Sequence, residues 1–226
     1  MNASDRLAAL MPIVVKDDEL HARWLNTFSY LEYVGFRKII KSQRADTLSR
    51  AFLNHALEEG GHAFLLKNMA VKVGGKAFDY YTPETMLCPE AASAYFQNLD
   101  HGCDEKFAAL PDLERSKIVY YYVTWLIERR ALDVYGRYRD VLGTSPLAAQ
   151  LDDLLGEEVG HLRQVEASLA AGDPEHESRA PALEAFETDL FDTFVAALAR
   201  ELAPAKAFSS EVDAGSREEN ALKQKN

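Results

Sequence analysis

Apolar side chains recur every three or four positions through most of the chain, a spacing that predicts amphipathic helices. Strict alternation of apolar and polar residues, which marks half-buried strands, is nearly absent. Glycine and proline gather at a few places and divide the periodic segments from one another. The sequence therefore predicts an all-α protein, with helices over 17–43, 46–74, 89–107, 112–143, 146–172 and 181–202.

Residues at several helix ends support these limits. Asp46 is expected to cap the N-terminus of the second helix, and Gly74 and Gly75 are expected to end it. Ser145 is predicted as the N-cap of the 146–172 helix, because the proline that follows it suits the first helical position.

The order of the helices suggests two pairs. The first two helices are joined by a short connection, and so are those over 112–143 and 146–172. Short connections favour antiparallel neighbours. A long crossover with its own short helix links the two pairs, and a last helix follows them. We expect a single domain over 1–203 and a disordered polar tail over 204–226.

The motif Glu-Glu-x-x-His occurs twice, once in each predicted helix pair. It ends at His62 in the first pair and at His161 in the second. The second glutamate of each motif, Glu59 or Glu158, lies three residues before the histidine, so the two side chains share one helix face. Each carboxylate and its imidazole can therefore reach the same metal ion.

Two more glutamates lie on the partner helices. Glu32 and Glu128 interrupt apolar stripes in the helices that precede the two motifs. A buried carboxylate without a partner costs several kcal/mol, so four of them are tolerable only beside cations, and two divalent ions match their charge. Oxygen and nitrogen donors without a thiolate favour iron or manganese over zinc or copper. The predicted metal ligands are Glu32, Glu59, His62, Glu128, Glu158 and His161.

This ligand pattern resembles that of the ferritin-like di-iron carboxylate superfamily over about 17–172. The resemblance implies a ferritin-like four-helix bundle of two antiparallel helix pairs and a long crossover, with extra mid-chain and C-terminal helices. It implies two Fe ions as cofactors, with Mn or a mixed Mn/Fe pair as variants. Glu59 and Glu158 would bridge the two ions. Glu32 and Glu128 would be more terminal, and each histidine would bind one ion.

The resemblance also implies an activity. We expect a di-iron oxidoreductase that activates dioxygen to oxidise a small organic substrate, with electrons from a donor. Aldehyde-deformylating oxygenases and tRNA-hydroxylating enzymes share this ligand scheme. One alternative is an iron-handling protein, a ferroxidase or peroxide scavenger, without an organic substrate. Another is a structural bundle whose acids pair with Arg or Lys. A haem-oxygenase-like di-iron fold would leave Glu32 without a role.

Residues beside the predicted ligands leave further alternatives open. His55 resembles the extra histidine of di-iron arylamine N-oxygenases, but a histidine at the helix boundary is the preferred interpretation. Glu58 and Glu157 could accept hydrogen bonds from ligand imidazoles or lie on the surface. Some glycines either allow close helix packing or leave space beside the metals: Gly35, Gly60, Gly61 and Gly160. Some aromatic residues could line a pocket or pack in the core: Phe28, Phe36, Phe52, Tyr121 and Tyr135.

Composition and charge limit the kinds of partner that the protein is expected to bind. The net charge of −11 over 226 residues repels phosphate backbones, so nucleic acid is not expected as a partner. No window approaches 18 consecutive apolar residues, so no membrane span is predicted. Two cysteines and the lack of a signal-peptide pattern favour a reducing compartment, and we expect a cytoplasmic protein. A homodimer is compatible with these properties.

Overall fold

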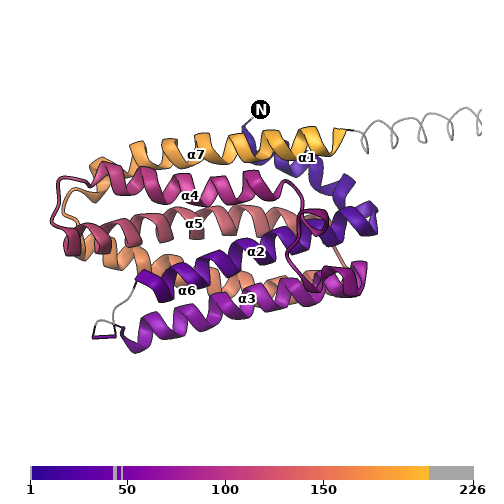
Figure 1. Cartoon of the computed structure of the whole chain (residues 1–226), viewed down its shortest axis with the longest axis horizontal. Coiled ribbons are helices and arrows are strands. Elements are labelled where there is room, and N and C mark those ends of the chain that lie inside the picture. Colours follow the sequence, from indigo (N-terminus) through magenta and orange to yellow (C-terminus); the bar gives the residue numbers. More distant parts are fainter. Residues whose placement is uncertain (1, 43–44, 47, 204–226) are drawn as a thin grey trace, which may run out of the picture.

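The computed structural model describes residues 2–42, 45–46 and 48–203. This part of the chain is helical and contains no strand (Figure 1). None of its helices is both long and apolar enough to cross a membrane. The predicted polar tail over 204–226 lies outside the described residues. The α-helices are α1 (Ala3–Lys16), α2 (Asp18–Ser42), α3 (Arg50–Gly74), α4 (Pro89–Lys106), α5 (Asp112–Leu142), α6 (Pro146–Gly172) and α7 (His176–Glu201).

Two antiparallel helix pairs form the body of the bundle. In Figure 1, α2 and α3 run side by side in opposite directions, and α5 and α6 do the same. The chain between the pairs contains two short 3₁₀ turns, η1 (Lys76–Asp79) and η2 (Pro83–Thr85), and then α4. Helices α1, α4 and α7 pack against the α2 and α5 side of the bundle. Among the described residues, α1, α4 and α7 make their main helix contacts with α2, α5 and one another rather than with α3 or α6.

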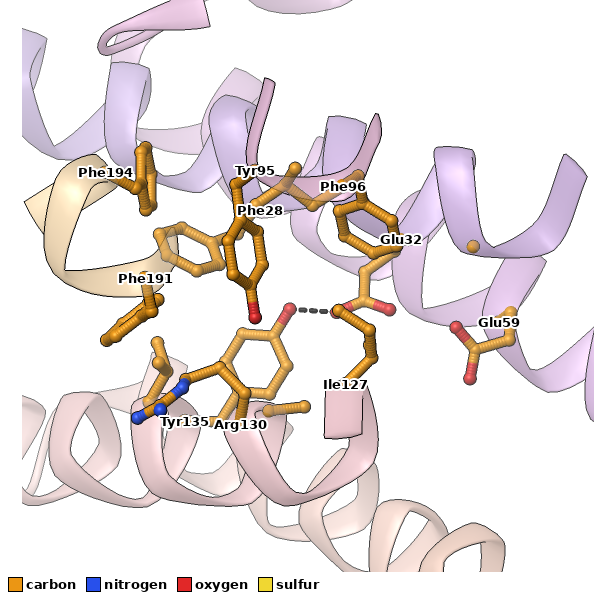
Figure 2. Close-up of a pocket in the computed structure, with 14 residues that line it drawn as sticks. Phe28, Glu32, Glu59, Tyr95, Phe96, Ile127, Arg130, Tyr135, Phe191 and Phe194 are labelled. Carbon is orange, nitrogen blue, oxygen red and sulfur yellow. Dashed lines mark hydrogen bonds between the residues drawn. The ribbon is translucent and has the colours of Figure 1, made fainter. Parts of the chain in front are cut away.

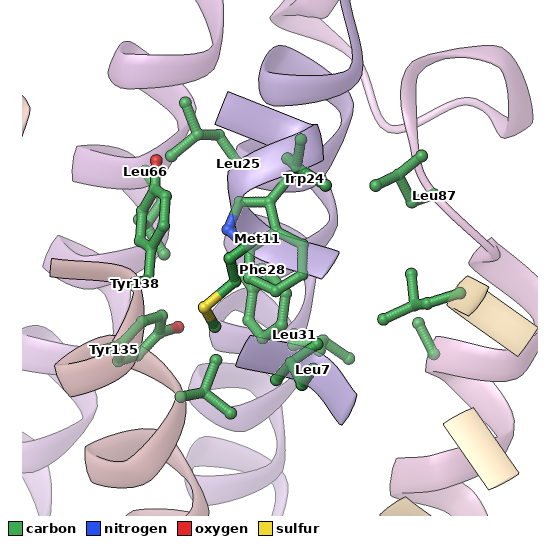
Figure 3. Packing of buried hydrophobic residues seen from close by; sticks show 14 of the residues in the cluster. Leu7, Met11, Trp24, Leu25, Phe28, Leu31, Leu66, Leu87, Tyr135 and Tyr138 are labelled. Atoms are coloured by element: carbon green, nitrogen blue, oxygen red, sulfur yellow. The ribbon is translucent and has the colours of Figure 1, made fainter. Parts of the chain in front are cut away.

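Two apolar clusters fill the interior at different heights along the bundle. Figure 3 shows Tyr135 and Tyr138 of α5 in the Trp24 cluster. The cluster also takes residues from each of the helices α1 to α7. The Trp125 cluster contains residues from the N-terminal half of α5 and the C-terminal half of α6. Glu128 lies on α5 between the two sets of apolar positions. The polar side chains near the middle of the long helices therefore lie between two apolar layers that exclude water.

The structure adds one helix to those predicted from the sequence and corrects the start of two others. Helix α1 was not predicted at all; Asn2 caps it, its side chain accepting a hydrogen bond from the Asp5 backbone N–H at 2.8 Å. Helix α3 is capped by Ser49 rather than Asp46, because Ser49 Oγ accepts a hydrogen bond from the Phe52 N–H at 3.3 Å. Helix α7 begins at His176, earlier than expected, and holds Pro181 inside it.

Helix α1 has a strongly buried face. Leu7, Met11 and Val14 are spaced for one side of a helix, and each is at most 1% exposed. We expect Leu7→Ala to lower the free energy of unfolding by about 2–5 kcal/mol, because the truncation leaves a cavity in the Trp24 cluster. Denaturant melts would measure this, with the exposed Ala9→Ser as control. Equal stability of the two variants would mean that α1 does not dock as described.

Candidate metal centre

The structure brings all six predicted ligands together. They come from the middle of four helices, and all six are buried. Their donor atoms form two groups, in each of which the atoms lie within 4.8 Å of one another. Glu59 belongs to both groups. The Glu32 group consists of Glu32, Glu59, His62 and Glu158, and the Glu128 group consists of His55, Glu59, Glu128 and His161.

The Glu32 group contains buried donor atoms that have no partner. His62 Nδ1 lies 3.2 Å from Glu158 Oε1. Within the described residues, His62 Nδ1 and Glu59 Oε1 are buried and make no hydrogen bond. Glu32 accepts a hydrogen bond from the Tyr135 hydroxyl, which fixes one of its oxygens. A buried nitrogen that faces carboxylate oxygens without a hydrogen bond costs free energy unless a proton or a metal ion lies between them, so these residues fit a metal ion.

The Glu128 group contains a histidine that sequence reasoning left at the helix boundary. His55 Nε2 lies 3.1 Å from Glu128 Oε1 and 3.3 Å from Glu59 Oε1. Its ring centroid is 4.1 Å from that of His161. His55 is therefore a buried, hydrogen-bonded member of this group, and its role as a ligand stays a prediction. A signal for it exists in the chain, because His55 precedes Glu59 by one helical turn on the same face.

The two carboxylates predicted as bridges each face more than one histidine. Glu158 places Oε1 3.2 Å from His62 Nδ1 and Oε2 3.2 Å from His161 Nδ1. Glu59 Oε1 lies 3.3 Å from His161 Nδ1 and also 3.3 Å from His55 Nε2. One carboxylate can therefore serve donors of both groups, which is the arrangement that a two-metal site requires.

Each motif histidine is held by a glutamate from the other motif. His62 Nε2 on α3 lies 2.7 Å from Glu157 Oε2 on α6, and His161 Nε2 on α6 lies 2.8 Å from Glu58 Oε2 on α3. The Nε2–H of each ring can donate to its carboxylate, which leaves Nδ1 as the lone-pair donor toward the metal positions. Of the two sequence alternatives for Glu58 and Glu157, this geometry supports the hydrogen-bond acceptor.

The carboxylates and imidazoles change one another's proton affinity. Burial raises the pKa of Glu32 and of Glu128 well above its usual range, and the charges of neighbouring glutamates raise it further. Burial alone would lower the pKa of His62, but close contact with the Glu158 carboxylate outweighs it and raises the pKa to about 10. The pKa of His161 rises to about 11 in the same way. Without metal, protons must therefore supply the positive charge that this cluster needs.

Two cavities reach the centre from different sides. One, of about 50 Å³, touches Glu32 and Glu59 (Figure 2). The other, of about 110 Å³, touches His55 and His161. Of the predicted pocket aromatics, Phe28 and Tyr135 line the first, and Phe52 and Tyr121 line the second. Phe36 lines neither cavity and packs with Ile39, Ala56 and Tyr120.

Sequence reasoning missed the aromatic residues that close the first cavity. They come from α4 and α7, which carry none of the predicted ligands, so nothing in the motif pointed to them. These residues are Tyr95, Phe96, Phe191 and Phe194.

The glycines near the motifs differ in their surroundings. A Cβ added at Gly35 would lie 3.2 Å from Glu59 Oε2, whereas one added at Gly61 or Gly160 would meet nothing within 4 Å. Close packing therefore does not explain Gly61 or Gly160. Gly35 leaves room for a predicted ligand.

This contrast gives a matched pair of variants. We expect Gly61→Ala to raise the free energy of unfolding by about 0.5–1 kcal/mol, the usual gain for Gly→Ala within a helix, and to leave metal binding unchanged. Gly35→Ala should weaken metal binding by roughly tenfold, because its methyl group displaces the Glu59 carboxylate. Titration with Fe(II) under anaerobic conditions would measure both. Equal metal affinity in the two variants would show that Glu59 can move freely.

No protein-family model, no curated protein and no solved structure matches this chain. The buried donor groups of the described residues are therefore what any account of its function must start from.

Proposed function

We propose that this protein is a ferritin-like di-iron carboxylate oxidoreductase that activates dioxygen to oxidise a small organic substrate. The observation that carries the proposal is the pair of buried donor groups that share Glu59. A single metal ion would leave one group of acids and histidines without a cation. Two adjacent ions satisfy both.

The helical arrangement supports the ferritin-like part of the proposal. Two antiparallel pairs joined by a crossover through α4 have the topology of such a bundle. Helices α2 and α5 each supply one glutamate, and α3 and α6 each supply a glutamate and the histidine three residues later. This division of ligands among four helices is typical of di-iron carboxylate proteins.

The donor atoms support iron, with manganese or a mixed pair as variants. Carboxylate oxygens predominate, imidazoles complete both groups, and no thiolate is among them. When bound, iron(II) ions supply the electrons for dioxygen reduction. Glu58 and Glu157 keep the histidines oriented, and Tyr135 holds Glu32. The two apolar clusters keep bulk water away from the donors, and an electron donor would restore the reduced ions.

One observation favours the alternative of a ferroxidase or peroxide scavenger. The 110 Å³ cavity beside His55 and His161 also has polar walls, formed by Thr124, Gln164 and Ser168. Walls of this kind suit water and hydrated cations. An iron-handling protein needs such a route, whereas an oxygenase needs it only for loading the metals.

Reconstitution with Fe(II) under anaerobic conditions, followed by mixing with dioxygen, would test both candidates. We expect close to two Fe per chain. Optical spectroscopy should show that these ions are oxidised once, and that the oxidised centre decays faster when the correct organic substrate is present. Repeated oxidation of many added Fe(II) ions would instead support the ferroxidase. Trace metal in a protein whose circular dichroism shows an intact fold would exclude both.

A further inference from the structure

The cavity at the Glu32 group has almost entirely apolar walls. It lies between α2, α4, α5 and α7, and Figure 2 shows aromatic rings of α2, α4 and α7 around it. Its walls include Phe28, Phe96, Ile127, Ala131, Val134 and Phe194. The Glu32 and Glu59 carboxylates are at one end. We call this space the apolar cavity.

The remaining charged group on the wall, Arg130, is already neutralised. Its Nε and Nη2 donate to the two oxygens of Glu187 at 2.8 and 2.7 Å. Its Nη1 donates to Ser4 and Asp133 at 3.1 and 3.2 Å. The guanidinium carbon lies 4.0 Å from the centre of the Phe191 ring. Four of the five N–H groups of Arg130 are therefore engaged, and its charge is balanced by the Glu187 and Asp133 carboxylates.

The Glu187 carboxylate, which balances the charge of Arg130, has its hydrogen bonds satisfied as well. Glu187, which is 4% exposed, also accepts a hydrogen bond from the Tyr95 hydroxyl at 2.7 Å. Away from the Glu32 and Glu59 end, a substrate carboxylate or ammonium group placed in the apolar cavity would find no unpaired counter-charge on the walls. Burial of such an unpaired charge is strongly unfavourable, so the wall selects an uncharged molecule.

The volume of the apolar cavity sets an upper limit on the size of the molecule that can bind in it. Engineered apolar cavities of about 150 Å³ stay dry and bind benzene or xenon. The apolar cavity measures about 50 Å³, which leaves space for a molecule of only a few heavy atoms. The cavity at the other group is larger, about 110 Å³, and has Thr124, Gln164 and Ser168 on its walls. The two donor groups are thus approached through chemically different spaces.

We propose that the apolar cavity is a binding site for a small, uncharged, apolar molecule, of about the size of dioxygen, beside the Glu32 group. The inference rests on the proposed two-metal function and specifies which of its reactants binds from this side. Dioxygen and a short organic substrate share this chemistry. The larger cavity at His55 and His161, which we call the polar cavity, has Thr124, Gln164 and Ser168 on its walls, and these side chains offer hydrogen-bond partners to water.

Xenon is the appropriate probe, because it is uncharged, apolar and visible by anomalous diffraction. We expect crystals of the iron-loaded wild-type protein under xenon pressure to show one xenon atom in the apolar cavity. Ala131→Leu, which fills this cavity, should reduce xenon occupancy at least tenfold. Ser168→Leu, a matched substitution in the wall of the polar cavity, should leave xenon in place.

The iron content of each crystal separates the two proposals. A wild-type protein with two irons and no xenon in the apolar cavity, or with xenon only in the polar one, would overturn this inference and leave the proposed function standing. If the wild-type protein does not retain iron, the proposed two-metal function is overturned instead. The rate of Fe(II) oxidation then identifies the natural occupant. A rate at least tenfold slower in Ala131→Leu assigns the cavity to dioxygen, and an unchanged rate assigns it to the organic substrate.

Discussion

Replacing Glu59 with alanine should remove both metal ions from the protein. Glu59 is the residue that belongs to both donor groups. Its Oε1 lies 3.3 Å from His55 Nε2 and 3.3 Å from His161 Nδ1, and its other oxygen faces Gly35. Loss of this carboxylate would remove a ligand from each proposed metal position and one of the negative charges that would hold two cations close together. Metal analysis after anaerobic reconstitution would show less than a tenth of the wild-type iron.

Glu58→Ala is the matched control for this experiment. Glu58 is the preceding residue of α3, and it touches the site only through His161 Nε2, at 2.8 Å. Its loss frees the ring to rotate, so metal affinity should fall roughly 10- to 100-fold while two ions still bind at high concentration. If Glu58→Ala and Glu59→Ala lose iron equally, the assignment of ligand and hydrogen-bond acceptor within the motif is wrong. Circular dichroism would confirm that both variants remain helical.

The metal-free protein should lose stability as pH rises from about 6.5 to 9, and the metal-loaded protein should not. Contact with carboxylates raises the pKa of His62 to about 10 and that of His161 to about 11. Over this range the folded protein therefore holds protons that an unfolded histidine releases near its ordinary pKa of about 6.5. A state that binds more protons is favoured at low pH, so the free energy of unfolding falls as pH rises. The raised pKa values of Glu32 and Glu128 act with the same sign.

Both the size of this dependence of stability on pH and its change of sign on metal binding can be measured. Each proton held only in the folded state contributes up to about 1.4 kcal/mol per pH unit, and we expect a total of at least about 1 kcal/mol per unit in the metal-free protein. With metal bound, the imidazoles are deprotonated and protons compete with the ions, so stability rises with pH. Urea melts of both forms at several pH values would test this. Slopes of the same sign would mean that the acids and histidines do not form one cluster, and His62→Gln should reduce the metal-free slope.

Local spacing in the sequence was enough to predict the helices that carry the site. Glu59 and His62 are one turn apart, so their common face follows from helix geometry alone, and Glu32 and Glu128 stand out because they interrupt apolar stripes. These are relations within one helix. The structure brings the resulting six residues together, and the nature of the metal and the reaction stay proposals.

Relations between helices were harder to predict. The pairing of Glu58 with His161 depends on how α3 faces α6, and periodicity within each helix does not reveal this orientation. The apolar cavity depends on α4 and α7, which enclose it without contributing a ligand. Helix α1 was missed although Leu7, Met11 and Val14 have helical spacing, because Pro12 lies inside it and a proline usually interrupts a helix.

Each donor group draws on both halves of the chain. The Glu32 group takes Glu158 from α6, and the Glu128 group takes His55 and Glu59 from α3. During synthesis, a nascent chain that has emerged only through α4 already displays several donors, but neither group is complete. If the two groups hold metal, complete sites therefore form only after α6 has been made and the two hairpins have met.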